Sequence, residues 1–245
     1  MASAWPRPSS APLPMVYRRF KGPRPMPDGR TPNFWIQDIT PDQDEQIVDF
    51  MSDGFLKEEF MCSRSGLPED PVSLQEMRDE WRQRLKHRAG LVALTDWPDG
   101  PHNPQLAGCN VTYITRRGDP PIKAEGAALR HVLDAMHAVE ARVDLFARFG
   151  VEAFLNALGL SVAPAFRRQG LGRELLAARE PLLRALGLRL TIAVFTGPAA
   201  QKASARAGYV VLAQQRFVDC KDDDGREVFP DVPWEVFQLK AKYIE

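Results

Sequence analysis

The sequence predicts a mixed α/β (α+β) fold, in which helices pack on a sheet and a ligand site lies beside a central strand. Two observations carry this prediction. Short apolar runs typical of strands alternate with segments of helical periodicity along most of the 245 residues. In addition, residues 157–172 (ALGLSVAPAFRRQGLG) have the pattern of a strand, a tight turn and the start of a helix, with two glycines where the helix begins.

Composition fits a folded domain and disfavours several classes of function. A chain of 245 residues that is 44% hydrophobic can bury a full core. The net charge is zero, so nothing argues for nucleic acid or a membrane surface as a partner, and no apolar run is long enough to span a membrane. Cys62, Cys109 and Cys220 are widely spaced. That spacing argues against a disulfide framework and against a metal site, and it favours a reducing, cytoplasmic setting.

Residues 1–30 are expected to form a disordered, proline-rich, basic arm ahead of one domain that spans residues 31–245. The arm contains seven prolines and six arginines or lysines, with few large apolar residues. It lacks the apolar core of a signal peptide, and its proline density disfavours an amphipathic targeting helix.

The first half of the domain begins with a strand. Thr40 and Pro41 then predict the start of a helix, because threonine is a good N-cap and proline suits the first helical position. Apolar side chains recur every three or four residues in the longer segments that follow, which is helical spacing. The expected elements of this half are a strand over residues 34–39, a helix over 72–85, strands over 91–94 and 108–114, and a long helix over 127–147.

The second half is organised around the central strand, residues 158–162. Pro164 should end this strand, because proline has no backbone N–H to donate. A leucine-rich helix opens near Leu171, and Pro181 is expected to kink or split it. The remaining expected elements are a strand over residues 190–195, a helix over 199–207, and strands over 210–218 and 235–240.

The loop at residues 167–172 (RRQGLG) is a candidate phosphate site. Gly170 and Gly172 allow the backbone to approach a ligand closely, and the first amides of a helix have no intrahelical partner. Such amides favour an anion, above all a pyrophosphate, and Arg167 and Arg168 add positive charge. The alternative is a helix that simply starts beside two glycines. The loop is neither a dinucleotide fingerprint nor a P-loop, because no Gly-Lys-Ser/Thr follows.

These residues together resemble a known superfamily. Arg-x-x-Gly-x-Gly after a strand with Ser-Val-x-Pro resembles the acetyl-CoA motif of the GNAT acyltransferases, and residues 194–209 (VFTGPAAQKASARAGY) resemble its second motif. The similarity covers about residues 33–245 and is nearest to invertebrate arylalkylamine N-acetyltransferase-like proteins. It implies the GNAT fold, a mixed and mostly antiparallel seven-stranded sheet flanked by helices, with splayed central strands.

The resemblance also implies acetyl-CoA as co-substrate and no metal. Leu160, Ser161 and Val162 would hold the pantetheine arm through the backbone of the central strand. Gln201 would contact the coenzyme from the following helix; the alternative is an exposed helix glutamine. The residues expected around the pyrophosphate are Arg167, Arg168, Gln169, Gly170, Leu171 and Gly172.

The implied reaction is acetyl transfer to a primary amine, with an arylalkylamine as the first candidate. An alkylamine has a pKa of about 10.4, so removing its proton near neutral pH costs roughly 4 kcal/mol. Glu59 falls at the family's glutamate base, with Phe60 where proline is usual; the alternative is a solvated glutamate at a helix end. Ser204 falls at the position of the general acid, with Ala200 where a partner serine often stands; the alternative is an ordinary helix serine.

Two other functions remain open at this stage. One is a GNAT enzyme that acts on a polyamine or an amino acid, or that uses a longer acyl donor. The other is a catalytically silent acyl-CoA-binding protein, suggested by the altered Phe60 and the missing partner serine. In each case we expect a monomer whose partners are small molecules.

Overall fold

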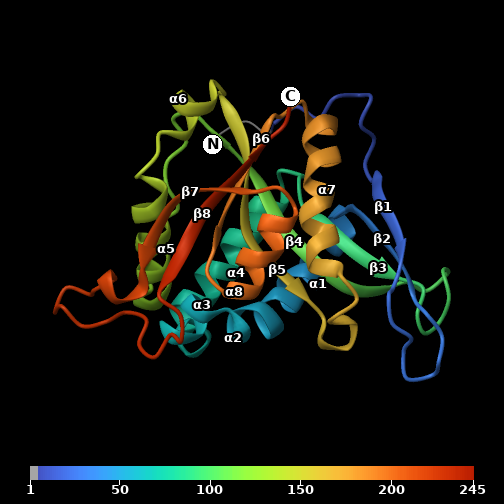
Figure 1. Ribbon diagram of the computed structural model, residues 1–245, viewed down its shortest axis with the longest axis horizontal. Coiled ribbons are helices and arrows are strands. Elements are labelled where there is room, and N and C mark those ends of the chain that lie inside the picture. Colours follow the sequence, from blue (N-terminus) through green and yellow to red (C-terminus); the bar gives the residue numbers. More distant parts are fainter. Residues whose placement is uncertain (1–4) are drawn as a thin grey trace.

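The computed structural model describes residues 5–245, and its strands form one eight-stranded sheet (Figure 1). The strands are β1 (Val16–Lys21), β2 (Asn33–Asp38), β3 (Leu91–Thr95), β4 (Gln105–Arg116), β5 (Ala153–Val162), β6 (Leu190–Phe195), β7 (Val210–Arg216) and β8 (Val236–Tyr243). Their order is β1-β2-β3-β4-β5-β6-β8-β7, and every neighbouring pair is antiparallel except β5 and β6. The mixed, mostly antiparallel sheet is therefore confirmed, with one strand more than the seven expected.

The additional strand is β1, which lies in the segment expected to be a disordered arm. It pairs with β2 from Val16 to Lys21. Arg7 also reaches back to the carboxylate of the fully buried Asp38, with 2.6 Å between Nη2 and Oδ2. The expectation of disorder is wrong for this part of the arm, because β2 supplies a ladder and a buried charge that the local composition does not reveal. Residues 1–4 lie outside the described residues.

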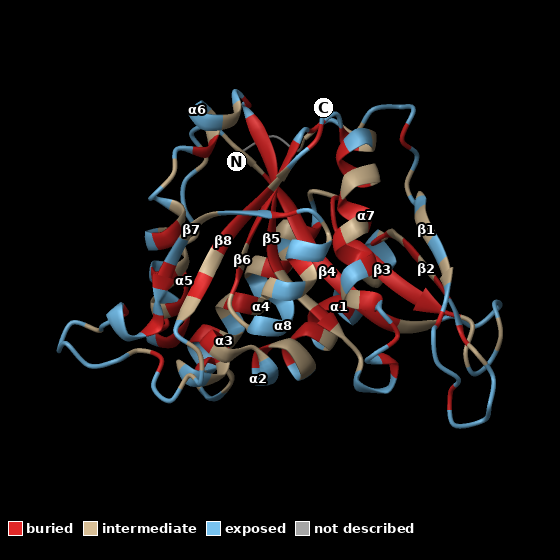
Figure 2. Ribbon diagram, viewed as in Figure 1, coloured by how far each residue is buried: buried red, intermediate tan, exposed pale blue. Residues whose placement is uncertain are grey.

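Helices cover both faces of the sheet. They are α1 (Asp44–Phe50), α2 (Leu56–Glu58), α3 (Phe60–Arg64), α4 (Pro71–Leu85), α5 (Ala127–Glu140), α6 (Leu145–Phe149), α7 (Leu171–Leu186) and α8 (Pro198–Arg206). Alternate strand residues serve the two faces: Leu91 and Ala93 pack with α7, whereas Val92 packs with α4 and α5. Figure 2 shows β3, β4 and β5 buried along most of their length between these layers. Among residues 5–245, no helix is long and apolar enough to cross a membrane.

Two helices differ from the expected ones. The segment 127–147 divides into α5 and α6, because Asp144 starts a new helix by accepting a hydrogen bond from the amide of Ala147 (2.9 Å). Helix α7, by contrast, continues through Pro181. Leu175 and Leu182 lie on either side of this proline and are both fully buried in one core cluster, so packing holds the helix together across it.

The two central strands separate soon after they meet. Strands β5 and β6 are parallel and are paired at Leu155 and Thr191, whereas β6 then continues along β8 as far as Phe195. The splayed central strands are thus confirmed. The divergence leaves one edge of the outer part of β5, residues 160–162, without a neighbouring strand, and this is where the candidate site lies.

Glu140, at the end of α5, should make the stability of the fold depend on pH. Burial raises the pKa of its carboxyl group from 4.5 to about 7, while a hydrogen bond with the Asn156 side chain opposes the shift. The folded protein therefore keeps a proton that the unfolded chain releases between these values. The resulting stabilisation is complete below pH 4.5 and is lost as the pH rises through 7.

Glu140→Gln is expected to raise the free energy of unfolding at pH 8 by about 2 kcal/mol, because the neutral amide removes the cost of a buried negative charge. At pH 5 the variant and the wild type should differ little. Thermal unfolding at both pH values measures this, with the exposed Asp134→Asn on the same helix as control. The same gain in stability at both pH values would rule out titration of Glu140 as its cause.

Candidate active site

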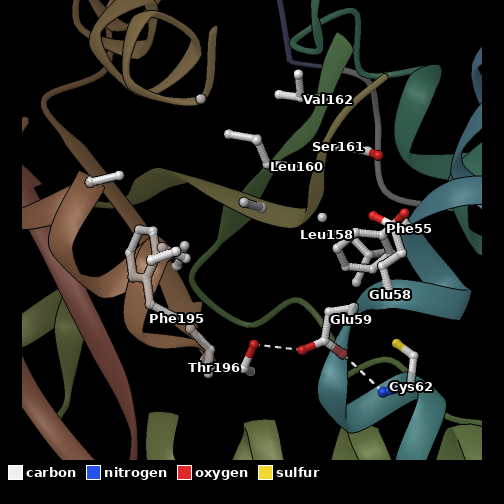
Figure 3. A pocket seen from close by; sticks show the side chains of 18 of the residues that line it. Phe55, Glu58, Glu59, Cys62, Leu158, Leu160, Ser161, Val162, Phe195 and Thr196 are labelled. Atoms are coloured by element: carbon white, nitrogen blue, oxygen red, sulfur yellow. Dashed lines mark hydrogen bonds between the residues drawn. The ribbon is translucent and has the colours of Figure 1, made fainter. Parts of the chain in front are cut away.

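A cavity of about 700 Å³ lies where β5 and β6 separate. Its walls come from α3 and α5 on one side, and from α8 and the start of α7 on the other. Figure 3 shows Leu160, Ser161 and Val162 of β5 beside it, with Glu59 and Thr196 facing each other at its lower end. The three β5 residues predicted to hold pantetheine therefore line the same cavity as the predicted base.

The loop at residues 167–172 leads into α7 and forms the wall of the cavity at the N-terminus of that helix. Gly170 caps the helix in the left-handed region (φ 84°), and Arg168 lies there too (φ 63°). The first backbone hydrogen bond of the helix runs from the amide of Glu174 to the carbonyl of Gly170. The amides of residues 171–173 therefore have no acceptor within the helix. A Cβ atom added to Gly172 would meet open space. These free amides fit the pyrophosphate of acetyl-CoA, and the gap between the strands fits its pantetheine arm.

Five of the six predicted loop residues line the cavity, namely Arg167, Arg168, Gly170, Leu171 and Gly172. Arg167 also reaches α2, where its guanidinium donates to both carboxylate oxygens of Glu58 (2.6 Å to Oε1). Both side chains are about half exposed, so this pair contributes little to stability, but it neutralises Glu58.

The side chains of Gln169, Gln201 and Ser204 do not line the cavity. Gln169 turns to the backbone of residue 24, and the Gln201 amide donates to the carbonyls of Phe195 (3.2 Å) and Val236 (2.9 Å). The Ser204 hydroxyl is fully buried and donates to the carbonyl of Gln201 (2.9 Å). The cavity face of α8 is instead formed by Ala199, Ala200 and Ala203. The structure therefore turns the Gln201 and Ser204 side chains away from the positions expected for a coenzyme contact and a general acid, whereas Gln169 was expected to contribute only its backbone amide.

Glu59 lies at the break between α2 and α3. Its backbone is extended (ψ 128°), and its side chain caps α3 by accepting a hydrogen bond at Oε2 from the amide of Cys62 (2.9 Å). Its other oxygen, Oε1, accepts a hydrogen bond from the Thr196 hydroxyl (2.5 Å), as Figure 3 shows. These two hydrogen bonds fix the position and orientation of the carboxylate.

Thr196 and Trp234 complete this arrangement and were not among the predicted residues. Thr196 follows β6, and its carbonyl accepts a hydrogen bond from the Trp234 indole (2.5 Å). The Trp234 ring in turn packs edge-on against Phe60, with 4.0 Å between ring centroids. Phe60 thus holds the Glu59 turn through an aromatic contact. The available signal for Thr196 was a hydroxyl directly after the strand of the second motif.

Cys62 lies beside Glu59 but is not a nucleophile. Burial raises the pKa of its thiol well above the usual value of 9.0, and the charge of Glu59 raises it further. The thiol therefore stays protonated at neutral pH, and only the thiolate would be reactive. Its place in the cavity wall is that of a small apolar side chain.

Thr196→Val should lower kcat/KM about tenfold for any amine that uses Glu59 as base. Valine has nearly the shape of threonine but cannot donate to the carboxylate, and a hydrogen bond to a charged group contributes about 1.5 kcal/mol. Thr196→Ser keeps the hydroxyl and should stay within about twofold of the wild type. Steady-state kinetics at pH 7.5 measure both. A loss in Thr196→Ser without a loss in Thr196→Val would mean that the methyl group, not the hydroxyl, matters.

The side of the cavity beyond Glu59 is apolar. We call it the apolar chamber and define it by Met61, Met77, Leu129, Val132, Leu133 and Met136. These residues come from α3, α4 and α5, and their helices pack together in the main core cluster. Among the described residues that line the whole cavity, the carboxylates are Glu58 and Glu59, and Glu58 is already paired with Arg167.

Comparison with known proteins agrees with this geometry. Residues 66–209 match the model of the Acetyltransferase (GNAT) family. No curated protein sequence matches the chain. A crystal structure from the mosquito Aedes aegypti, provisionally named arylalkylamine N-acetyltransferase 7, has a TM-score of 0.90 and 28% identity, covering 98% of this chain and 100% of its own.

Two more distant structures share the fold. Arylalkylamine N-acetyltransferase 2 from Aedes aegypti has a TM-score of 0.75 and 20% identity, covering 86% of this chain and 99% of its own. A Drosophila melanogaster polyamine N-acetyltransferase that forms N-acetylagmatine has a TM-score of 0.73 and 22% identity, covering 86% of this chain and 100% of its own. The same architecture therefore serves proteins named for different amines.

Proposed function

This chain belongs to the GNAT acetyltransferase family, and we propose that it transfers the acetyl group of acetyl-CoA to a primary amine with an apolar body, most closely an arylalkylamine. One observation carries the proposal. A single carboxylate without a cationic partner, that of Glu59, faces an otherwise apolar chamber. An amine could place its nitrogen at Glu59 and its apolar body among the methionines and leucines of the chamber.

Glu59 is the proposed general base. Near neutral pH an alkylamine is protonated, and it must lose that proton before it can attack a carbonyl carbon. The amide of Cys62 and the hydroxyl of Thr196 hold the carboxylate in place at the edge of the chamber. Acetyl-CoA supplies the reactive thioester. The backbone of residues 160–162 and the amides at the start of α7 would hold it in the gap between β5 and β6.

The departing thiolate receives no proton from Ser204 in this proposal, because that hydroxyl is buried and bonded within α8. The alanines on the cavity face of the helix have no group that could donate a proton. Since a thiolate is already a fair leaving group, its protonation by solvent suffices.

The charge of the cavity favours a monoamine over a polyamine. A second ammonium group in the chamber would have no carboxylate partner, because Glu58 is bonded to Arg167. Burying an unpaired charge among apolar side chains is strongly unfavourable. A polyamine or agmatine is thus the second candidate, as is an amino acid, whose carboxylate would meet the apolar chamber.

Purified protein mixed with acetyl-CoA and a panel of amines tests the proposal through the release of free thiol. Tryptamine, dopamine and tyramine should be acetylated with higher kcat/KM than spermidine or agmatine. A preference for the polyamines would make the enzyme a different GNAT acetyltransferase. Tight binding of acetyl-CoA without turnover of any amine would make the protein a silent acyl-CoA-binding protein.

We also propose that the protein works as a monomer in the cytoplasm. Cys62, Cys109 and Cys220 are all unpaired and buried, which suits a reducing compartment. The cavity is lined within one chain, so one chain can carry the reaction.

A further inference from the structure

The N-terminal segment lies against the phosphate loop, residues 167–172. Its contact is made by Gln169, which is 4% exposed. The side-chain amide of Gln169 donates to the carbonyl of Arg24 (3.0 Å) and its oxygen accepts from the amide of the same residue (3.2 Å). One glutamine side chain thus satisfies both backbone groups of Arg24, across 145 residues of sequence. These reciprocal hydrogen bonds hold residues 22–26 beside the loop in the way that backbone hydrogen bonds hold two neighbouring strands together.

Contacts on both sides of Gln169 strengthen this attachment. Met26 belongs to the same buried cluster as Phe166, which precedes the loop, and Leu171, which lies within it. Arg18 of β1 donates to the carboxylate of Glu174 in the first turn of α7 (2.6 Å). The segment is therefore fixed before, within and after the phosphate loop.

The N-terminal segment and the phosphate loop approach each other so closely at Gly22 that a glycine is required there. A Cβ atom added to Gly22 would lie 2.7 Å from Oε1 of Gln169, well inside van der Waals contact. Gly22 itself is held by a hydrogen bond from its amide to the carbonyl of Pro32 (2.8 Å). Any larger residue at position 22 would push against the oxygen that bonds Arg24.

The phosphate loop needs such support. Gln169 stands between Arg168 (φ 63°) and Gly170 (φ 84°), both in the left-handed region. That region is unfavourable for arginine, and such a backbone persists only where its surroundings hold it. The bonds of Gln169 to Arg24 are a hold of this kind. The same backbone leads into residues 171–173, which line the cavity and whose amides have no acceptor within the helix.

We propose that residues 22–26 support the cofactor site from outside the cavity, and that Gln169 is a positioning residue that uses them to preorganise the loop for the phosphates of acyl-CoA. The inference rests on the proposed use of this loop by acetyl-CoA. Gln169 itself does not line the cavity. A loop already in its binding conformation loses less entropy when the ligand binds, so the contact should be visible as affinity.

Isothermal titration of CoA into four proteins tests the proposal: wild type, Gln169→Ala, Gly22→Ala and the double variant. Each single substitution is expected to raise Kd about tenfold. In the Gln169→Ala background Gly22→Ala should add less than twofold, because the oxygen it displaces is gone. Hydrogen exchange of the amides of residues 167–172 should become faster in both single variants. Thermal unfolding confirms that each variant is folded.

The outcomes distinguish a failure of the proposed function from a failure of the inference about Gln169 and residues 22–26. No binding of CoA to the wild type would remove the proposed function and this inference together. Binding to the wild type with Kd within twofold in both single variants would overturn the inference alone. So would losses that add fully in the double variant, because Gly22 would then act independently of Gln169. As an activity check, the KM for the amine should be unchanged at saturating acetyl-CoA.

Discussion

Replacing Glu59 with glutamine is expected to lower kcat for an arylalkylamine about a hundredfold at pH 7, since a general base contributes at least that factor. Glutamine keeps one oxygen to accept from the amide of Cys62, and its NH2 group can donate to the Thr196 hydroxyl, which can also accept, so the turn between α2 and α3 should survive. The amide cannot accept the proton of the ammonium ion. The loss should therefore shrink as the pH approaches the amine's own pKa of about 10.4, where the neutral amine no longer has to be generated.

The measurement is the release of free thiol at pH 7 and pH 10 for wild type and Glu59→Gln. Glu69→Gln is the matched control, because Glu69 is an exposed glutamate on the short turn Leu67–Glu69 and does not line the cavity. It should retain wild-type kinetics. An equal defect at both pH values would show that Glu59 positions the substrate without acting as a base.

Loss of the buried Arg179 should markedly reduce stability. It is 2% exposed on α7, and its acceptors are neutral: Asn110 Oδ1 (2.8 Å), Thr191 Oγ1 (3.4 Å) and the carbonyl of Ile192 (3.3 Å). Asn110 in turn donates to the carbonyl of Gly159 (2.7 Å). The guanidinium therefore links β4, through Asn110, to β6 at the place where β5 and β6 part. It satisfies a β6 carbonyl just beyond the Leu155–Thr191 pair.

Arg179→Met should lower the free energy of unfolding by about 3 kcal/mol, because it leaves the Asn110 and Ile192 oxygens buried without donors. For a chain of this size that corresponds to a fall in Tm of about 8 °C. Arg184→Met, an exposed position on the same helix, should change Tm by no more than about 2 °C. Calorimetry measures both. A Tm within 2 °C of wild type for Arg179→Met would mean that water replaces the lost donors.

The sequence predicts those features of the site that depend on the local chain. The free amides at the start of α7, residues 171–173, and the central strand at 158–162 follow from short patterns of glycine, proline and apolar residues. Glu59 was placed by its resemblance to a family position, and the structure brings it to the cavity. The splay of β5 and β6 likewise came from the resemblance, since no local pattern reveals where two strands part.

The direction of polar side chains could not be predicted in the same way. Gln169 and Gln201 find backbone partners 145 and 35 residues away, so only the tertiary structure decides that they turn from the cavity. Ser204 is on the buried face of α8, and the face depends on how that helix packs. Strand β1 was not predicted, because the proline-rich composition is a property of the whole segment 1–30. The pairing with β2 involves only a short stretch within it.

The central claim is that one carboxylate receives one ammonium in an otherwise apolar chamber. Hexylamine and 1,6-diaminohexane form a matched pair that tests it, because they differ only by a second amino group. The kcat/KM of each with saturating acetyl-CoA at pH 7 is the measurement. Hexylamine should be preferred about a hundredfold, since the second ammonium would be buried unpaired. Equal or better use of the diamine would contradict the account and point to a polyamine site.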